Sequence, residues 1–162
     1  MRLEGIVALI TGAARGMGAC EARLFAEEGA KVCVADVDEK QGRSVADNII
    51  KSGGDVFFSK LDITSEDNWA STVNEIVSRF GKLNVLVNNA AIDHVGTVEE
   101  TTGDDWDRVM EVNAKGAFLG TKTVIPFMRQ AGGGSIINIS SGAGLVGSLT
   151  GTVYNLSLIH IS

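Results

Sequence analysis

The sequence predicts an α/β fold in which strands and helices alternate and the strands form a parallel sheet. Short runs rich in Val and Ile alternate with longer segments whose apolar residues recur every three or four positions. The strand-like runs are continuously apolar, as expected when helices cover both faces of a sheet. Glycine supplies 20 of the 162 residues and falls mainly at segment ends, where tight turns require it.

Five strands are expected, each a short apolar run that ends at a turn or a polar residue: 6–10, 31–35, 56–61, 83–87 and 135–139. Helices are expected between them, over 17–28, 39–51, about 64–80, and from Thr101 or Thr102 to Gln130. The third helix has a predicted capping box at 64–67, one apolar face, and Gly81 at its C-cap. This order of elements predicts βαβ units in one doubly wound, Rossmann-type sheet without an internal linker.

The composition argues against binding to nucleic acid or to an anionic membrane by charge. Lys and Arg (14) are outnumbered by Asp and Glu (20), the net charge is −6, and no basic cluster occurs. No apolar run approaches the ~18 residues of a membrane span. Cys20 and Cys33 make neither a disulfide framework nor a metal site, and we expect both to be small core residues. A cytoplasmic location is therefore expected.

The first expected strand leads into a glycine-rich turn, TGAARGMG at 11–18. Glycines at such a turn allow the backbone to approach a diphosphate closely, and the next helix directs free N–H groups at that anion. A glycine loop that only caps a βα unit is the alternative. The position of the turn, between the first strand and the first helix, favours a dinucleotide-binding site.

Polar residues at three further strand ends extend this predicted site. Asp36 ends the second strand, where a carboxylate accepts hydrogen bonds from the adenosine ribose and repels a 2′-phosphate, so NAD is favoured over NADP. Asp62 ends the third strand and is expected to contact the adenine, and Asn88 and Asn89 follow the fourth. Each has a structural alternative: an acid can simply end a strand, and an amide can tie neighbouring strand ends.

Together these segments resemble the short-chain dehydrogenase/reductase family over residues 1 to about 155. The matching motifs are, in order, 11–18, Asp36, Asp62-Ile63, Asn88-Asn89-Ala90, Asn113, Ser140-Ser141 and Tyr154. The sequence is most similar to the NAD-dependent secondary-alcohol and hydroxysteroid dehydrogenases. Ala91 is a small departure, because the family usually has glycine there.

The resemblance implies hydride transfer between NAD(H) and a small-molecule secondary alcohol or ketone. It implies Tyr154 as the acid/base, Ser141 as a hydrogen-bonding partner of the substrate oxygen, and Asn113 as the holder of a water in the proton relay. Ser141 is preferred to Ser140 because it lies thirteen residues before the tyrosine. The implied cofactor-binding residues are Gly12, Arg15, Gly16, Met17, Gly18, Asp36, Asp62, Ile63, Asn89, Ala90 and Tyr154. A homodimer or homotetramer is also implied.

The family pattern breaks after Asn155. The family places a lysine four residues after the tyrosine, where it binds the nicotinamide ribose and lowers the tyrosine pKa, but this position holds Leu158. A free tyrosine, with a pKa near ~10, is ionised in only about one molecule in a thousand at pH 7. We therefore expect the 162-residue chain to lack dehydrogenase activity.

Residues 1–155 are interpreted as the N-terminal part of one NAD-binding domain, since members of the family run to roughly 250 residues. The tail 156–162 matches the translation of a common transposase sequencing adapter, and we interpret it as foreign. A natural, divergent C-terminus is the alternative. If the tail is foreign, His160 is neither a ligand nor a base, and the fifth strand is an edge with a partly bare apolar face.

Two other functions stay open. Leu158 favours a non-catalytic NAD-binding module if the tail is natural, and a sugar-nucleotide epimerase or dehydratase uses the same scaffold but usually has a longer substrate domain. Among the remaining residues, Trp69 and Trp106 are expected to pack against neighbouring elements. His94 is expected to be a solvated loop residue rather than part of a substrate pocket.

Overall fold

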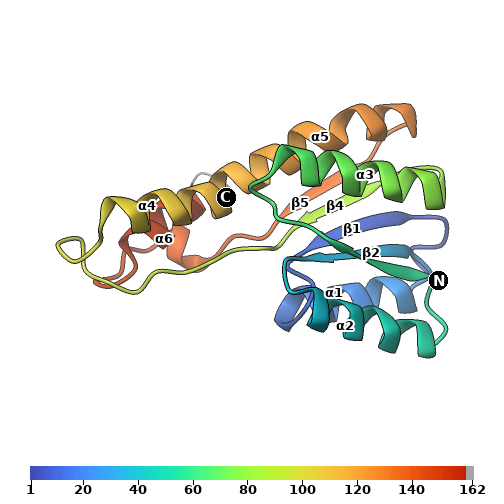
Figure 1. Ribbon diagram of the computed structural model, residues 1–162, viewed down its shortest axis with the longest axis horizontal. Helices are drawn as coiled ribbons and strands as arrows, with labels where there is room; N and C mark the ends of the chain where they lie inside the picture. Colours follow the sequence, from blue (N-terminus) through green and yellow to red (C-terminus); the bar gives the residue numbers. More distant parts are fainter. Residues whose placement is uncertain (160–162) are drawn as a thin grey trace.

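The computed structural model describes residues 1–159 and consists of a five-stranded parallel sheet with helices on both faces (Figure 1). The strands are β1 (Val7–Thr11), β2 (Lys31–Asp36), β3 (Val56–Lys60), β4 (Val85–Asn88) and β5 (Ser135–Asn138). The helices are α1 (Gly16–Glu27), α2 (Glu39–Lys51), α3 (Glu66–Phe80), α4 (Gly103–Met110), the π-helical turn η1 (Glu111–Lys115), α5 (Gly116–Gln130), the 3₁₀ turn η2 (Gly142–Gly144) and α6 (Thr152–Ile159). The predicted doubly wound α/β fold is confirmed.

The strand order β3-β2-β1-β4-β5 creates a point where the winding of the sheet reverses. All four strand pairs are parallel. The chain moves outward from β1 through β2 to β3, and β4 then returns to the opposite side of β1. Ligands of open α/β sheets bind outside the carboxyl ends of the strands at such a reversal. The sheet order therefore places the expected site between the ends of β1 and β4.

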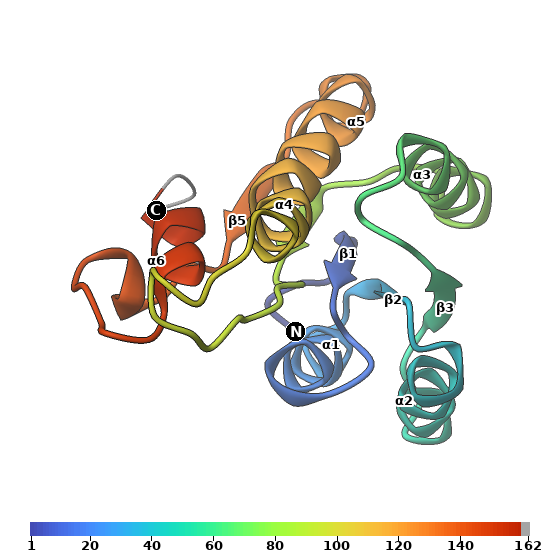
Figure 2. The ribbon, with the colours of Figure 1, turned by 60° about the vertical axis from the view of Figure 1, so that its left-hand side comes forward.

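The core forms two layers, one on each face of the sheet, because alternate strand residues point to opposite faces. On one face, Leu9 belongs to a buried cluster with Trp69 of α3 and Leu119 of α5. On the other, Val34 belongs to a buried cluster with Ala22 of α1. Figure 2 shows α1 and α2 on one side of the strands and α3 and α5 on the other.

The long helical region expected up to Gln130 is present, but one turn of it is not α-helical. It begins with a capping box in which the Thr102 hydroxyl accepts a hydrogen bond from Asp105 N and the Asp105 carboxylate accepts one from Thr102 N. Between α4 and α5, η1 carries Asn113. π-Helical turns are rare and frequently occur at functional sites.

The capping residue of α3 differs from the one expected. Ser65 is the N-cap, and its hydroxyl accepts a hydrogen bond from Asn68 N at 3.3 Å. Thr64 donates to Asp62 instead, which excludes the predicted capping box at 64–67. At the other end, Gly81 ends the helix as predicted, with φ of +81° in the left-handed region that suits glycine.

Two of the four expected packing residues are exposed. Cys33 and Trp69 are buried as predicted, whereas Cys20 is exposed and Trp106 is 41% exposed. Cys20 faces solvent because α1 packs on the sheet through its alanines, including Ala22, which permit close approach. The expectation that Cys20 is a core residue is therefore wrong, and Cys20 lies on the outer face of the helix.

The C-terminal part of the described chain leaves the sheet. β5 is the edge strand, and Ile137 is 39% exposed, in agreement with the expected partly bare edge. Beyond the carboxyl ends of the strands, α6 packs beside α4 (Figures 1 and 2). Residues 156–159 belong to α6, whereas His160 lies outside the described residues. Within residues 1–159, no helix is both long and apolar enough to cross a membrane.

Candidate functional site

The glycine loop after β1 needs glycine at two positions for steric reasons. Gly12 has φ of +64°, and a Cβ there would lie 2.8 Å from the Ala90 Cα. A Cβ on Gly18 would lie 2.6 Å from both the Asn89 Nδ2 and the Gly12 carbonyl oxygen. The loop is thus packed directly against the segment that follows β4, and neither Gly12 nor Gly18 leaves room for a side chain.

Thr11 and Asn89 join the ends of β1 and β4. The Thr11 hydroxyl donates to the Val87 carbonyl at 3.2 Å and accepts from the backbone N–H groups of Asn89 and Ala90, both at 3.1 Å. The Asn89 side-chain amide donates to the Thr11 carbonyl at 2.8 Å and to the Gly12 carbonyl at 3.3 Å. Asn89 therefore has the strand-tying role that was the alternative to ligand binding, while it also lines the cleft described below.

Asp36 holds the glycine loop to the end of β2. Its Oδ2 accepts a hydrogen bond from Ala14 N at 3.0 Å, and its Oδ1 accepts one from Asp38 N at 2.9 Å. Each carboxylate oxygen has two acceptor sites, so capacity for ribose hydroxyls is left on both. The sequence pattern predicts that Asp36 accepts hydrogen bonds from the ribose hydroxyls. It does not predict that Asp36 also holds the glycine loop to the end of β2.

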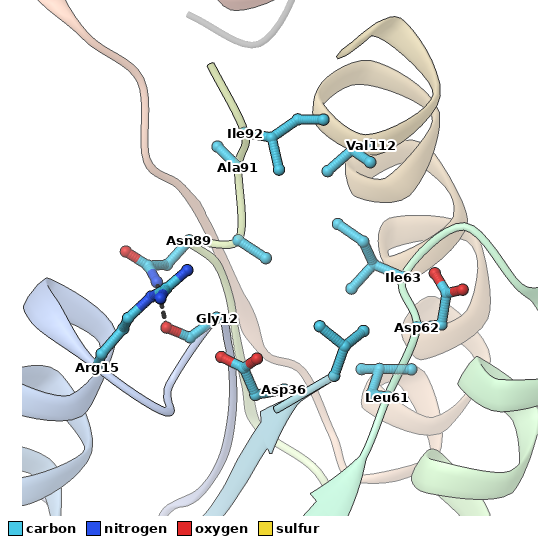
Figure 3. A pocket seen from close by; sticks show the side chains of 12 residues that line it. Gly12, Arg15, Asp36, Leu61, Asp62, Ile63, Asn89, Ala91, Ile92 and Val112 are labelled. Atoms are coloured by element: carbon cyan, nitrogen blue, oxygen red, sulfur yellow. Dashed lines mark hydrogen bonds between the residues drawn. The ribbon is translucent and has the colours of Figure 1, made fainter. Parts of the chain in front are cut away.

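A cleft of about 270 Å³ lies where these segments meet. Figure 3 shows Arg15 and Asp36 near one end, and Ile92 and Val112 at the other. Seven of the predicted cofactor-binding residues line it: Gly12, Arg15, Asp36, Asp62, Ile63, Asn89 and Ala90. A dinucleotide fits this chemistry, with an open glycine turn, a helix N-terminus and an acceptor at a strand end.

Other predicted cofactor-binding residues lie beside the cleft. Gly16 and Met17 begin α1, and Gly18 packs against the Gly12 carbonyl oxygen and the Asn89 side chain. Asp62 lines the cleft, but its Oδ1 accepts hydrogen bonds from the backbone N–H and the hydroxyl of Thr64, which fixes a local turn. This interaction gives Asp62 a structural function in addition to the expected adenine contact.

Sequence reasoning missed five lining residues, all of them small or apolar: Val37, Leu61, Ala91, Ile92 and Val112. Three of them, Val37, Leu61 and Ala91, adjoin a predicted cofactor-binding residue in sequence. A rule that included the neighbours of each predicted strand end would have found these three, whereas Ile92 lies two positions after Ala90. Val112 comes from η1, and only its position before Asn113 pointed to it.

Asn113, the expected relay residue, is buried, and both hydrogens of its side-chain amide are donated in hydrogen bonds. Its Oδ1 accepts from Ile92 N at 2.9 Å, and its Nδ2 donates to the Ile92 carbonyl at 2.9 Å and to the Ser157 hydroxyl at 3.0 Å. A water can therefore only donate to the side-chain oxygen. Through these bonds Asn113 fixes Ile92, one wall of the cleft, to the π-helical turn.

The residues with predicted catalytic roles lie next to the cleft rather than in its lining. Ser141 is the N-cap of η2, and its hydroxyl accepts from Ala143 N at 3.2 Å. Tyr154 lies in α6, which packs against both η1 and η2. Among the described residues, Asn113, Ser141 and Tyr154 are absent from the cleft lining. The structure brings their elements together without placing all three side chains in one pocket.

Leu158 occupies the place where the resemblance requires lysine. Its side chain is 1% exposed and forms part of the packing of α6. The neighbouring Ser157 donates its hydroxyl hydrogen to the Tyr154 carbonyl at 2.8 Å while accepting from Asn113. Position 158 thus supplies neither a positive charge nor a hydrogen-bond donor near Tyr154.

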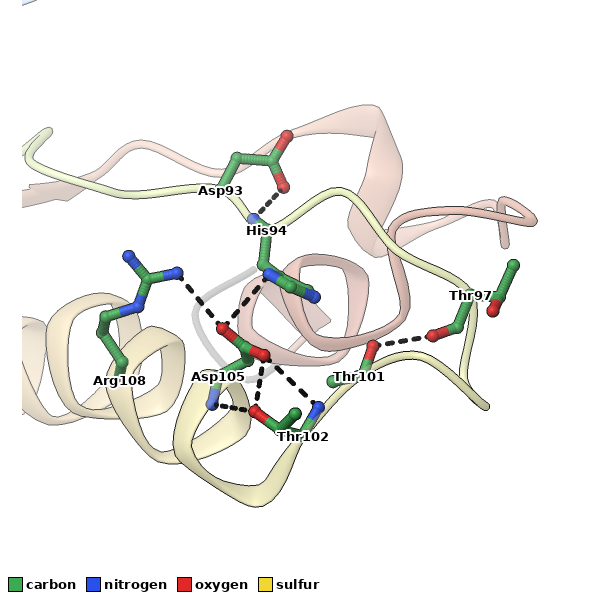
Figure 4. Close-up of polar contacts among 7 residues, drawn as sticks. All are labelled: Asp93, His94, Thr97, Thr101, Thr102, Asp105 and Arg108. Carbon is green, nitrogen blue, oxygen red and sulfur yellow. Dashed lines mark hydrogen bonds and ion pairs between the residues drawn. The ribbon is translucent and has the colours of Figure 1, made fainter.

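His94 is not the solvated residue that was expected. Its side chain is 18% exposed, and its Nδ1 lies 3.5 Å from the Asp105 Oδ1 (Figure 4).

Burial also distinguishes the two cysteines chemically. Desolvation raises the pKa of the Cys33 thiol well above its usual value, with a smaller contribution from Glu75.

Comparison with known proteins agrees with this geometry. The family model described as short chain dehydrogenase matches residues 6–157. Trans-4-hydroxycyclohexanecarboxylate dehydrogenase of Sinomonas cyclohexanicum is 49% identical over 152 residues, which cover 90% of this chain and 58% of that protein. A 3-alpha-(or 20-beta)-hydroxysteroid dehydrogenase of Mycobacterium tuberculosis is 45% identical, covering 91% and 56%.

A third relative and a solved structure extend the comparison. Cyclopentanol dehydrogenase of Comamonas testosteroni is 40% identical over 96% of this chain and 62% of its own length. The crystal structure of a metagenomic short-chain oxidoreductase in complex with NADP superimposes with a TM-score of 0.93 at 33% identity, covering 99% of this chain and 73% of that one. The chain thus spans somewhat more than half the length of these curated relatives. With the family model matching nearly all of the chain, and with the glycine loop and strand-end residues in place, the chain belongs to the short-chain dehydrogenase family.

Proposed function

We propose that this chain binds NAD and carries the cofactor-binding part of an oxidoreductase that transfers a hydride between NAD(H) and a secondary alcohol or ketone. The single observation that supports this most strongly is the cleft at the reversal of the sheet, which combines the open glycine turn with the Asp36 carboxylate. A diphosphate bound at the glycine turn would be held by the free backbone N–H groups at the N-terminus of α1, which stabilise negative charge.

The preference for NAD over NADP rests on Asp36. A 2′-phosphate at the adenosine ribose would lie against this carboxylate, and two like charges in close contact repel each other. Arg15 also lines the cleft and offers a positive charge, but it precedes α1, so we place it beside the diphosphate. The related metagenomic structure holds NADP, so the preference must be tested for this chain.

In the proposed reaction the bound nicotinamide supplies or accepts the hydride. Tyr154 transfers the proton to or from the substrate oxygen, and Ser141 donates a hydrogen bond to the same oxygen. Asn113 keeps Ile92, one wall of the cleft, in place. Relatives named for hydroxycyclohexanecarboxylate, cyclopentanol and hydroxysteroids support a cyclic secondary alcohol as the substrate class.

A non-catalytic NAD-binding module is the second candidate, and Leu158 is the observation that favours it. The described α6 helix carries no cationic side chain, so the cation that the resemblance pairs with Tyr154 is missing from it. In the chain as it stands we therefore expect cofactor binding without turnover.

We also propose assembly as a homodimer or homotetramer in the cytoplasm. Exposed aromatic side chains on the long helix support association, since Phe118 is 61% exposed and Trp106 nearly half exposed. Light scattering after size-exclusion chromatography measures the molecular mass of the assembly directly, and Phe118→Glu should shift this mass toward that of the monomer.

The proposed cytoplasmic location is supported by the two cysteines. Both are free thiols, which is usual in a reducing compartment.

The proposed function is tested in two steps. NADH fluorescence is titrated with the chain, and saturable enhancement is expected; absence of binding would reject both candidates. Reduction of NAD is then followed at 340 nm with cyclopentanol and with a hydroxysteroid, for the chain and for Leu158→Lys. Turnover that Tyr154→Phe abolishes supports the oxidoreductase, whereas binding without turnover in both forms supports the non-catalytic module.

A further inference from the structure

Trp69 connects the buried core to one wall of the cofactor cleft. It lies in the first turn of α3, it is fully buried, and its indole Nε1 donates to the Ile63 carbonyl at 2.8 Å. Ile63 lines the cleft (Figure 3) and is 9% exposed. A buried indole N–H requires a hydrogen-bond partner, and here that partner belongs to a residue of the cleft wall.

The residue before Trp69 holds the neighbouring residue of the same wall. Asn68 Oδ1 accepts a hydrogen bond from Asp62 N at 3.3 Å, and Asn68 Nδ2 donates to the Ser65 hydroxyl at 3.0 Å. Ser65 N in turn donates to the Asp62 carbonyl at 3.1 Å, which closes a turn. The Asn68–Asp62 bond is exposed, whereas the Trp69 bond is buried. Since water competes for the exposed bond, Trp69 is the stronger anchor of the wall.

Helix α5 leaves room for Trp69 and Ile63 at two glycines that lie one turn apart. An added Cβ on Gly120 would lie 2.6 Å from the Trp69 Cη2, and one on Gly116 would lie 2.6 Å from the Ile63 Cδ1. The indole ring and the isoleucine side chain therefore both contact α5 where it carries no side chain. Because the ring is confined on this side, its N–H keeps a fixed direction toward the Ile63 carbonyl.

The wall that Trp69 holds begins next to Asp36, the residue proposed to bind the adenosine ribose. Leu61 N donates to the Asp36 carbonyl at 3.0 Å, so the segment that leads to Ile63 starts directly beside it. The cleft lining contributed by Val37, Leu61 and Ile63 is apolar. A base attached to the bound ribose would pack against these side chains, and a purine would bury more apolar area there than a smaller base.

We propose that Trp69 is a positioning residue for the base of the dinucleotide. Its indole N–H holds the Ile63 carbonyl and so keeps the wall of Leu61, Asp62 and Ile63 where a purine packs against it. The role of the base in this statement rests on the proposed function, whereas the hold on the wall does not. Trp69 is fully buried and is absent from the described lining of the cleft, so it acts on the ligand only through Ile63.

The hold on the wall is tested in the chain without cofactor. Benzothienylalanine at position 69 replaces the indole N–H by sulfur and keeps the size of the ring, so it removes the donor alone. Hydrogen exchange of the Ser65 N–H, measured by NMR, should accelerate about fivefold, the ratio expected for the loss of one hydrogen bond. The same replacement at Trp106, which is the other tryptophan and is 41% exposed, should leave this rate unchanged. An unchanged Ser65 rate after the replacement at position 69 overturns the proposal.

The effect on the base is tested with two dinucleotides that differ only there. NADH and reduced nicotinamide cytosine dinucleotide share the nicotinamide, both riboses and the diphosphate, but cytosine lacks the second ring of a purine. The wild-type chain should bind NADH more tightly, and benzothienylalanine at position 69 should lower this preference about fivefold. The replacement at Trp106 should leave the preference unchanged. A loss of stability of the whole fold would weaken both affinities equally and would not alter their ratio.

The two measurements separate failure of this proposal from failure of the proposed function. If the wild-type chain binds neither dinucleotide, the proposed function fails and the role in base recognition with it, while the Ser65 exchange rate still decides whether Trp69 holds the wall. Equal affinities of the wild type for the two dinucleotides overturn the role in base recognition. A preference for NADH that the replacement at position 69 leaves intact overturns it as well.

Discussion

Gly18→Ala should destabilise the chain and distort the cofactor loop. The added Cβ would lie 2.6 Å from the Asn89 Nδ2 and from the Gly12 carbonyl oxygen, and 3.1 Å from the Ala13 Cα. Ordinary contact begins at 3.4 Å, so the first two atoms must each move by about 0.8 Å. Two of the three obstacles are backbone atoms, which cannot rotate away as a flexible side chain can.

The size of the effect follows from two opposing contributions. Overpacking of this kind costs about 1–3 kcal/mol, and alanine regains up to about 1 kcal/mol over glycine in a helix. A net loss of about 1–2 kcal/mol in the free energy of unfolding is expected. Displacement of Asn89 would also break its bonds to the Thr11 and Gly12 carbonyls, so NADH binding should weaken more than stability alone would indicate.

Urea unfolding followed by tryptophan fluorescence, to which the buried Trp69 contributes, measures the stability, and NADH titration measures binding. Gly103→Ala is the matched control, since Gly103 also begins a helix but has no atom within 4 Å of an added Cβ. It should leave stability unchanged or slightly increased. If Gly18→Ala unfolds at the same urea concentration as the wild type and binds NADH equally well, the steric argument is refuted.

Three further predictions follow from buried groups. Asn113→Ala should lower the free energy of unfolding by about 2–4 kcal/mol in urea titrations, because three hydrogen bonds of a buried side chain are lost; a loss below that of an exposed Asn74→Ala control would contradict this role. A thiol reagent at pH 8 should modify one cysteine in the native chain and two in urea, since the raised pKa and burial of Cys33 keep it protonated; Cys20→Ser should leave no reactive native thiol. Leu158→Lys should unfold at lower urea concentration than Leu158→Met, because a buried ammonium loses its hydration.

The regular elements could be predicted because local patterns determine them. The helix Glu39–Lys51 has the predicted bounds, and Gly81 ends α3 because glycine adopts the left-handed conformation without strain. The strand-end positions of Asp36 and Asn89 followed from the order of elements, which brings the carboxyl ends of parallel strands to one edge. This geometric constraint is why most of the cleft could be predicted.

The unpredicted features depend on contacts between distant residues. The π-helical turn at Asn113 shifts the helix by a fraction of a turn, which apolar periodicity does not resolve. The burial of His94 depends on Asp105, eleven residues later, and on the segment before α6. Cys20 is exposed because alanines rather than larger apolar residues make the inner face of α1. Apolar periodicity does not reveal the first two of these features, whereas the alanines of α1 do recur at helical spacing in the sequence and mark its inner face.

The central claim, that Asp36 makes this cleft a site for NAD, is tested most directly by paired titrations with NADH and NADPH. The wild-type chain should bind NADH at least about tenfold more tightly than NADPH, because the carboxylate accepts from the ribose hydroxyls and repels a phosphate. Asp36→Asn removes the charge and should bring the two dissociation constants close together. Equal affinities in the wild type, or a ratio that Asp36→Asn leaves unchanged, would contradict the account.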